Sequence, residues 1–278
     1  TLTIDTEQGG DSNAGAVNFG ASTLTASAAS LDLTINTIGN TDGGTVTLAN
    51  VDNSGGAFID DLTITTNSTN SGTINLNGTI TTTSNQSYDS GTVVLPNAVL
   101  VSNSGSITFS SDISSTNVIS INASQNISLQ ANADTIDAGG QDVTLTATNF
   151  NATSSLTTQN IDDLSLLISG TASINGNVDL TAATLTTGAG TLNSNGNLVD
   201  LNLTGNADIN MDINTAGGDF EVSGTNFDNS GGTIATSNGD IRLLNTGDIT
   251  VGANIDAGAG NVTFANGTSL TGGGTILA

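Results

Sequence analysis

The side chains in this sequence that could do chemistry are carboxylates, because it contains no His, Cys or Lys, and Arg242 is its only basic residue. Asp219 and Asp240 each follow a glycine in a phrase that recurs near the C-terminus. Stacked carboxylates could hold Ca²⁺, which takes roughly six to eight oxygen ligands. Asp and Asn also favour turns by bonding their own backbone, and the nine-residue repeat of calcium-binding β-rolls is missing. We therefore interpret the phrase as a turn, keep Asp219 and Asp240 as calcium candidates, and expect no other cofactor.

Paired carboxylates offer an enzymatic alternative, since two Asp side chains can cleave a glycosidic bond. Three sets occur in the sequence: Asp60 with Asp61, Asp162 with Asp163, and Asp208 with Asp212. Neighbouring residues on a strand point to opposite faces, so the adjacent pairs are expected to diverge. Without His, Cys or Lys the usual nucleophile–base pairs and transition-metal sites cannot be assembled. We expect no enzyme, and keep a β-helix that binds or cleaves polysaccharide through paired Asp as the alternative.

The charge balance excludes several classes of partner. The chain has 25 acidic residues and a formal net charge of −24, so it would repel nucleic acid and anionic lipid. No apolar run of about 18 residues is present to span a bilayer as a helix. The sequence starts without Met or an apolar leader, and we expect a processed piece of a larger precursor.

A repeat of about 21 residues organises the C-terminal part of the sequence, from Val178 onward. Its apolar positions form three columns, and the first two columns lie two residues apart, which is the period of a β-strand. Gly, Asn, Asp and Ser between them supply turns. The sequence therefore predicts an all-β protein, a parallel β-solenoid whose coils stack about 4.8 Å apart. The columns are Val178, Val199, Phe220, Ile241 and Val262; Leu180, Leu201, Val222, Leu243 and Phe264; and Leu192, Ile213, Ile234, Ile255 and Ile276.

The N-terminal half repeats the same vocabulary less regularly. The phrases that begin at Gly15, Gly44, Gly72 and Gly105 are unequally spaced, and each interval exceeds that of the regular repeat. These spacings indicate longer coils or insertions, and the candidate bulges are 81–91 and the surroundings of Pro96. We predict one elongated domain over 1–278 with about 13 coils of roughly 21 residues. The coils are expected to be irregular over 1–175 and regular over 176–278.

Thr-x-Thr pairs such as Thr63/Thr65 and Thr144/Thr146 could form a flat ladder that matches ice. Thr is also a favoured outward residue on any strand. The outward position between the first two core columns shows no such ladder, so an ice-binding solenoid is the less favoured alternative. That position holds Asp179, Asp200, Glu221, Arg242 and Thr263.

Two stretches carry a resemblance to a known family: SGTINLNGTITTTSNQSYDSGTVVLPNAVLVSNSGSITFSSDI (71–113) and GGDFEVSGTNFDNSGGTIATSNGDIRLLNTGDITVGANIDAGAGNVTF (217–264). They resemble repeats of filamentous-haemagglutinin-type and autotransporter-like bacterial surface adhesins. The resemblance implies a right-handed parallel β-helix, export to the cell surface, and a role in attachment, aggregation or biofilm, with no functional residue carried over. We expect an extracellular structural or adhesive fibre protein of the bacterial cell surface, with host or matrix glycans among its partners.

Both ends of the sequence, TLTID and GGTILA, read as strands without a cap. Uncapped coils expose unpaired backbone groups, and complementary ends can stack head to tail. We predict that Leu2, Ile4, Ile276 and Leu277 stack, either against a second copy or against neighbouring repeats of a longer chain.

Overall fold

A computed structural model describes residues 1–6, 14–39, 42–66, 72–130, 134–265, 267 and 269–278. The described residues form strands and turns and include no helix that could cross a membrane. The chain divides into two compact units, Thr1–Gly139 and Gly140–Ala278. The boundary lies within one strand, β17 (Thr135–Ala147).

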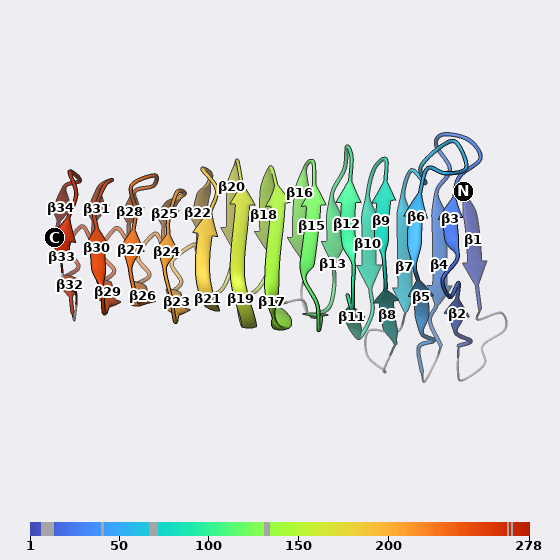
Figure 1. The fold of residues 1–278 in the computed structure, drawn as a ribbon, viewed down its shortest axis with the longest axis horizontal. Coiled ribbons are helices and arrows are strands. Elements are labelled where there is room, and N and C mark those ends of the chain that lie inside the picture. Colours follow the sequence, from blue (N-terminus) through green and yellow to red (C-terminus); the bar gives the residue numbers. More distant parts are fainter. Residues whose placement is uncertain (7–13, 40–41, 67–71, 131–133, 266, 268) are drawn as a thin grey trace. The chain divides into compact units, whose positions relative to one another are not determined.

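In the first unit, each complete turn contributes three strands (Figure 1), and these strands pair in parallel with those of the next turn. One isolated bridge, between Ala26 and Ala57, is antiparallel. The first strands of the turns are β1 (Leu2–Asp5), β4 (Leu33–Thr37), β7 (Leu62–Thr66), β10 (Gln86–Asp89), β13 (Ile107–Phe109) and β16 (Asn126–Leu129). The second strands are β2 (Val17–Asn18), β5 (Val46–Leu48), β8 (Thr73–Leu76), β11 (Thr92–Val94) and β14 (Ile113–Ser114). The third strands are β3 (Thr23–Thr25), β6 (Asn50–Asp52), β9 (Thr79–Thr82), β12 (Val99–Ser102) and β15 (Ile119–Ala123).

The second unit has the same order of strands, but its earlier turns lack one corner. There β19 (Leu156–Ile168) and β21 (Val178–Thr187) each run through the second and third positions as one strand. The first strands are β18 (Asn149–Ala152), β20 (Thr171–Ile174), β22 (Thr191–Asn193), β25 (Asp212–Asn214), β28 (Ile234–Ala235), β31 (Ile255–Asp256) and β34 (Ile276–Leu277). The later second strands are β23 (Val199–Leu203), β26 (Phe220–Gly224), β29 (Ile241–Asn245) and β32 (Val262–Phe264). The later third strands are β24 (Ala207–Asp208), β27 (Phe227–Asp228), β30 (Asp248–Thr250) and β33 (Ser269–Thr271).

The predicted class, an all-β parallel β-solenoid, is confirmed. The pairing of strands in successive turns also gives the number of residues in each turn. About ten turns have roughly 21 residues each, and the number of such turns is slightly smaller than the thirteen predicted. The first two turns are longer than those that follow. Their lengths are given by the pairing of Leu2 with Leu33 and of Leu33 with Leu62. In the second unit Leu192, Ile213 and Ile234 pair at the interval that the repeat predicts.

Two expectations for the N-terminal half are wrong. The phrases at Gly15, Gly44 and Gly72 do stack, but the phrase at Gly105 forms β13, a first strand that pairs with β10. The interval from Gly72 to Gly105 therefore does not correspond to the length of one turn. The predicted bulge at 81–91 contains β10, and Pro96 lies in a turn between β11 and β12. Gln86 and Tyr88 of β10 carry polar groups, yet both side chains are fully buried.

The core lies between the inward faces of the strands, where Val, Ile and Leu alternate with outward polar residues. The structure places the three predicted columns in register over all five rungs. Most of these side chains are buried. Val262, Phe264 and Ile276 are not, because no described strand lies beyond the last turn to cover them.

Candidate functional site

The corner carboxylates hold successive turns together. Asp219 Oδ1 accepts the backbone N–H of Asp240 at 2.8 Å, and Asp240 Oδ1 accepts the backbone N–H of Asn261 at 3.0 Å. The amide of Asn261 also donates to Asp240 Oδ1 at 3.1 Å. These bonds from Asn261, first the backbone bond and then the side-chain bond, hold the pKa of Asp240 below its usual value. Each corner carboxylate thus caps an amide of the next turn.

Arg242 binds the remaining oxygens of this cluster. Its Nη2 lies 2.9 Å from Asp240 Oδ2, and its Nη1 lies 3.3 Å from Asp219 Oδ2 and 3.5 Å from Glu221 Oε2. Both oxygens of Asp219 and of Asp240 are therefore engaged by protein donors. Among the described residues no group of three or more acidic side chains is arranged to hold a metal ion. The geometry gives the calcium candidates, Asp219 and Asp240, a structural role as turn caps.

Asp200 is the carboxylate in the least favourable surroundings. It lies between Asp179 and Glu221 in one outward column of adjacent rungs. Its Oδ1 is buried and has no hydrogen-bond partner among the described residues. Burial is the main cause that raises the pKa of Asp200, and the charges of Glu221 and Asp179 add to it, while a bond from Asn202 opposes the shift. The column therefore carries repulsion that Arg242 relieves only at its far end.

The acidic pairs considered for catalysis have separate hydrogen-bond partners. Asp60 Oδ1 accepts Ser84 Oγ–H at 2.8 Å, whereas Asp61 Oδ1 accepts the backbone N–H of Asn85 at 2.8 Å. Such bonds to the next turn stabilise corners, and they direct Asp60 and Asp61 to different partners rather than to a shared substrate position. Three of the other carboxylates also have their own partners: Asp163 accepts from Thr184, Asp208 from Asn210, and Asp212 from Thr233.

A groove of about 360 Å³ on the second unit collects several acidic and amide side chains. Asp208, Asp228 and Asp248 line it together with Phe227. A sugar-binding cleft would use an exposed aromatic ring, but Phe227 is only 1% exposed and belongs to the core. Asp228 is further held by Ser230, which donates to its Oδ1 through both its backbone and its hydroxyl. The groove thus provides polar lining without a stacking platform.

The first unit carries a column of hydroxyl side chains that includes Thr63 of the Thr63/Thr65 pair, but its full extent was not predicted from the sequence. The register places an outward Ser or Thr at the same position of every first strand there. The sequence feature that could have revealed this column is a Ser or Thr between two inward apolar residues, as in Leu62-Thr63-Ile64. Because the first turns differ in length, a search at a fixed spacing does not find that this feature recurs. The neighbouring outward column contains Asp5 and Asp89, so the hydroxyl surface is one residue wide. The hydroxyl column is Thr3, Thr34, Thr63, Ser87, Thr108 and Ser128.

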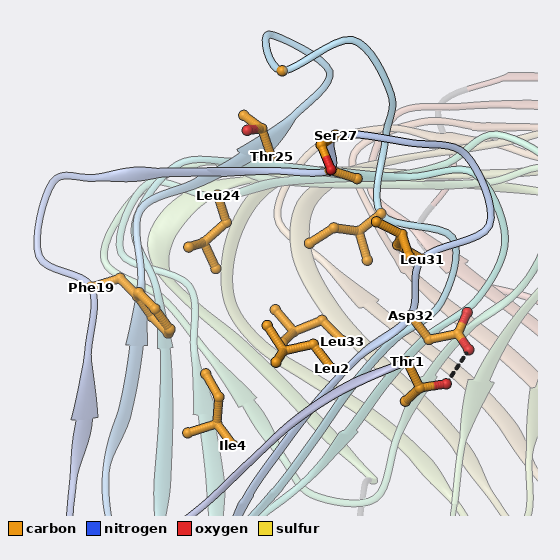
Figure 2. A pocket seen from close by; sticks show the side chains of 13 residues that line it. Thr1, Leu2, Ile4, Phe19, Leu24, Thr25, Ser27, Leu31, Asp32 and Leu33 are labelled. Atoms are coloured by element: carbon orange, nitrogen blue, oxygen red, sulfur yellow. Dashed lines mark hydrogen bonds between the residues drawn. The ribbon is translucent and has the colours of Figure 1, made fainter.

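The N-terminal end face of the first unit contains an apolar pocket of about 390 Å³ (Figure 2). Leu2 and Ile4 from β1, Phe19 after β2 and Leu24 from β3 line it. At its rim Thr1 Oγ1 donates to Asp32 Oδ2 at 2.9 Å. The predicted stacking residues Leu2 and Ile4 therefore lie on this end face, where Leu2 is 62% exposed.

The C-terminal end face of the second unit is also apolar. Ile276 and Leu277 of β34 are 38% and 50% exposed, and Leu270 of β33 is 55% exposed. Together with Phe264 of β32, they lie on the last described strand at each of the three strand positions. Each of these strands pairs with one described strand only, on its N-terminal side. Both end faces thus present apolar side chains, and within the described part of the chain no strand pairs with the outer side of β1 or of β34.

The chain matches no family model, no curated protein and no solved structure. The resemblance to bacterial adhesins therefore stays at the level of the β-solenoid, which the strand register itself establishes.

Proposed function

We propose that this chain forms the β-helical shaft of an extracellular structural or adhesive fibre at a bacterial cell surface. The observation that carries the proposal is the parallel pairing of each turn with the next inside both units, over a core of Val, Ile and Leu. Such coils repeat one supporting interaction many times, and their number can change without altering the local structure. This is a property of a spacer or shaft.

The role is mechanical rather than catalytic. Backbone hydrogen bonds join each turn to the next, and corner side chains such as Asp219 and Asp240 add further bonds in the same direction. A pull along the stack must break several of these bonds at once in every turn. No cofactor enters this proposal, and the pairs around Asp61 and Asp163 offer no observation that favours polysaccharide cleavage.

Composition supports a location outside the cell. The chain has no cysteine, and Arg242 is its only residue after which a trypsin-like protease could cut. A net charge of −24 opposes lateral association at low ionic strength. The partners that we propose are further coils of the same kind, from a second copy or from a longer chain, together with host or matrix glycans.

The hydroxyl column supports the adhesive part of this proposal. Hydroxyl groups both donate and accept hydrogen bonds, as do the hydroxyls of a neutral glycan. The residues Thr63, Ser87 and Thr108 present such groups in three adjacent rungs, at the spacing of about 4.8 Å of parallel strands. An ice surface would need a wider flat array, and charged Asp5 and Asp89 flank the column.

Electron micrographs of natively isolated material beside the recombinant 278-residue chain test the proposed function. We expect fibres in the native sample, and labelling of the protein on intact cells by an antibody raised against the recombinant chain. Globular particles in both samples, or labelling only after the cells are permeabilised, would contradict the proposal. Glycan binding is tested separately with the variant Thr63→Val/Thr108→Val, which keeps the strand-forming shape and removes two hydroxyls.

A further inference from the structure

We propose that Asn77 of the first unit is a site of spontaneous modification, at which the side-chain amide is lost and the backbone is rerouted through the side chain. The reaction consumes one water molecule and needs no enzyme or cofactor. Its product is an isoaspartyl linkage, or an ordinary aspartate, at the corner between β8 and β9. The inference does not depend on the proposed function, and its failure would leave that function untouched.

The chemistry belongs to the dipeptide Asn-Gly. The backbone nitrogen of the glycine attacks Cγ of the asparagine, its proton passes to solvent, and ammonia leaves as the bond between Cγ and Nδ2 breaks. The product is a cyclic imide. Water that attacks Cγ opens the ring to Asp, whereas water that attacks the backbone carbonyl carbon leaves the main chain running through Cβ and Cγ, as isoaspartate. Glycine favours ring closure because it has no Cβ to crowd the attacking nitrogen.

The Asn-Gly dipeptide recurs at several corners of this chain, and the hydrogen bonds of its two reacting groups differ from corner to corner. A bond donated by the glycine N–H must break before its nitrogen can attack, and a bond to the asparagine side chain restrains Cγ. The dipeptides begin at Asn77, Asn175, Asn195, Asn238 and Asn266, of which Asn266 lies outside the described residues.

Neighbouring turns hold two of these dipeptides in the second unit. Gly196 N–H donates to Thr215 O at 2.7 Å, and Asn195 Nδ2 donates to Asn175 Oδ1 at 2.9 Å. Both reacting groups of Asn195 are therefore engaged. Asn175 is protected by its side-chain bond alone, because the N–H of Gly176 finds no acceptor among the described residues. We expect Asn195 to be the most slowly modified of the described sites.

The dipeptide at Asn238 is held by longer bonds. Its Oδ1 accepts the backbone N–H of Ala259 at 3.3 Å, and the N–H of Gly239 donates to Thr236 O at 3.5 Å. Hydrogen bonds of this length are weak. We therefore expect Asn238 to react faster than Asn195, but more slowly than a dipeptide that makes no such bonds.

Neither reacting group of Asn77 and Gly78 is held in this way. Within the described part of the chain, the Asn77 side chain has no hydrogen-bond partner and the Gly78 N–H has no acceptor. Asn77 is also exposed, so water reaches its amide. Asn50, at the start of β6 in the preceding turn, behaves differently, because its Oδ1 accepts the N–H of Thr79 at 3.0 Å. The amide of Asn77 caps no such group and stays free to meet the nitrogen that follows it.

The packing of this corner requires the glycine that makes Asn77 reactive. A Cβ on Gly78 would overlap the carbonyl oxygen of Ala49 in the preceding turn. The corner is also bonded on both sides, since Asn77 N–H donates to Leu48 O at 2.9 Å and Gly78 O accepts the N–H of Val99 at 3.2 Å. Asn77 and Gly78 alone join β8 to β9. The joint is therefore short, and a change in its length is felt by the turns before and after it.

An isoaspartyl linkage adds one carbon atom to the main chain at this joint. The bonds to Leu48 and Val99 cannot both keep their geometry when the connection between β8 and β9 becomes longer. The reaction also adds a carboxylate to a chain whose formal net charge is already −24. The modification thus gives the first unit a corner that weakens as the protein ages.

Incubation of the recombinant full chain in heavy-oxygen water tests the site, because molecules that react during the incubation incorporate the label. Digestion with pepsin and mass spectrometry then follow each Asn-Gly peptide. We expect Asn77 to lose its amide at least about fivefold faster than Asn195, the factor that one ordinary hydrogen bond contributes to local opening. The rate at Asn77 should rise with pH, because the attacking nitrogen must lose its proton.

A synthetic peptide of residues 73–82 gives the rate without the fold, and Asn77→Gln is the matched control in the full chain. Gln keeps an amide but lengthens the side chain by one carbon, which disfavours ring closure, so position 77 should stay intact while the other sites react as before. Reaction at Asn195 as fast as at Asn77 would overturn the inference. So would an intact Asn77 after a period in which the synthetic peptide has reacted completely.

The weakening of the corner is tested by thermal unfolding. The aged parent should melt below the fresh parent, whereas aged Asn77→Gln, in which only the other sites react, should lose less. Fresh Asn77→Asp adds the charge without lengthening the backbone and should melt close to the fresh parent. Equal losses for the aged parent and aged Asn77→Gln would overturn the weakening, even where the mass spectra support the modification.

Discussion

The hydroxyl of Tyr88 donates to Gln86 Oε1 at 2.8 Å inside the core of the first unit, where both side chains are fully buried. Gln86 Nε2 in turn donates to the carbonyl oxygens of Ile80 at 3.1 Å and Val101 at 2.8 Å. The Tyr88 ring stacks on Phe109 with the ring centroids 5.4 Å apart. A polar pair thus takes the place of two apolar residues because each member satisfies the other.

Tyr88→Phe should destabilise the first unit. The substitution keeps the ring on Phe109 but leaves Gln86 Oε1 without its donor in the core, at a cost of about 1–3 kcal/mol. Urea unfolding followed by circular dichroism measures the loss. The double variant Gln86→Leu/Tyr88→Phe removes both polar groups and should lose less than the two single variants together. Additive losses would show that the two side chains are not coupled.

The same pair shows where sequence reasoning about this chain reaches its limit. A column of Val, Ile and Leu at a fixed interval predicts stacked strands without a structure, as Val199 and Ile241 illustrate, because burial repeats in every coil. Gln86 and Tyr88 are not part of a repeated column, and their burial depends on the hydrogen bond between them. A periodic pattern in the sequence cannot predict such a bond. The unequal spacing of the phrases predicted a bulge at 81–91, a segment that contains β10.

Candidate sites were harder to predict than the strands. The phrase at Gly105 has the same form as those at Gly44 and Gly72, yet it lies on a different strand position, because the corners of the first turns differ in length. A fixed spacing could therefore not align the hydroxyls of Thr63 and Thr108. Conversely, the apolar residues predicted at the ends, such as Leu2 and Ile276, follow directly from the strand pattern.

Gly239→Ala should destabilise the second unit by about 1–3 kcal/mol, the usual cost of overpacking. A Cβ at this corner would overlap the carbonyl oxygen of Gly218 in the preceding turn, and a backbone atom cannot move aside. Thermal unfolding is the readout. Gly273→Ala is the matched control, since a Cβ there meets nothing within 4 Å. Equal melting temperatures for the two variants would mean that the corner glycines are dispensable.

Arg242→Gln should lower the melting temperature of the second unit, and the loss should shrink as salt is added. Without the guanidinium, Asp219, Glu221 and Asp240 keep their charges in adjacent rungs and repel one another. These side chains are about one-third exposed, so the effect stays small and is screened by ions. Arg242→Lys keeps the charge and should retain part of the stability. A loss of the same size at every salt concentration would instead indicate packing by the side chain.

Asp200→Asn should stabilise the second unit at neutral pH, and the gain should vanish in acid. The pKa of Asp200 in the folded chain is raised above 3.8, so the folded state holds this proton more tightly than the unfolded state. The charged carboxylate therefore costs no stability below the unfolded pKa, and its cost grows as the pH rises through the folded pKa. We expect a gain of up to about 1 kcal/mol at neutral pH, limited by solvent screening of a partly exposed group.

Unfolding by urea between about pH 3 and pH 7 measures this dependence. Asp179→Asn is the matched control, because it removes one charge from the same column one rung away. It should gain less, since the buried Oδ1 without a partner belongs to Asp200. A loss of stability for Asp200→Asn at every pH would show that the charged carboxylate supports its strand, and the repulsion assigned to this column would then be wrong.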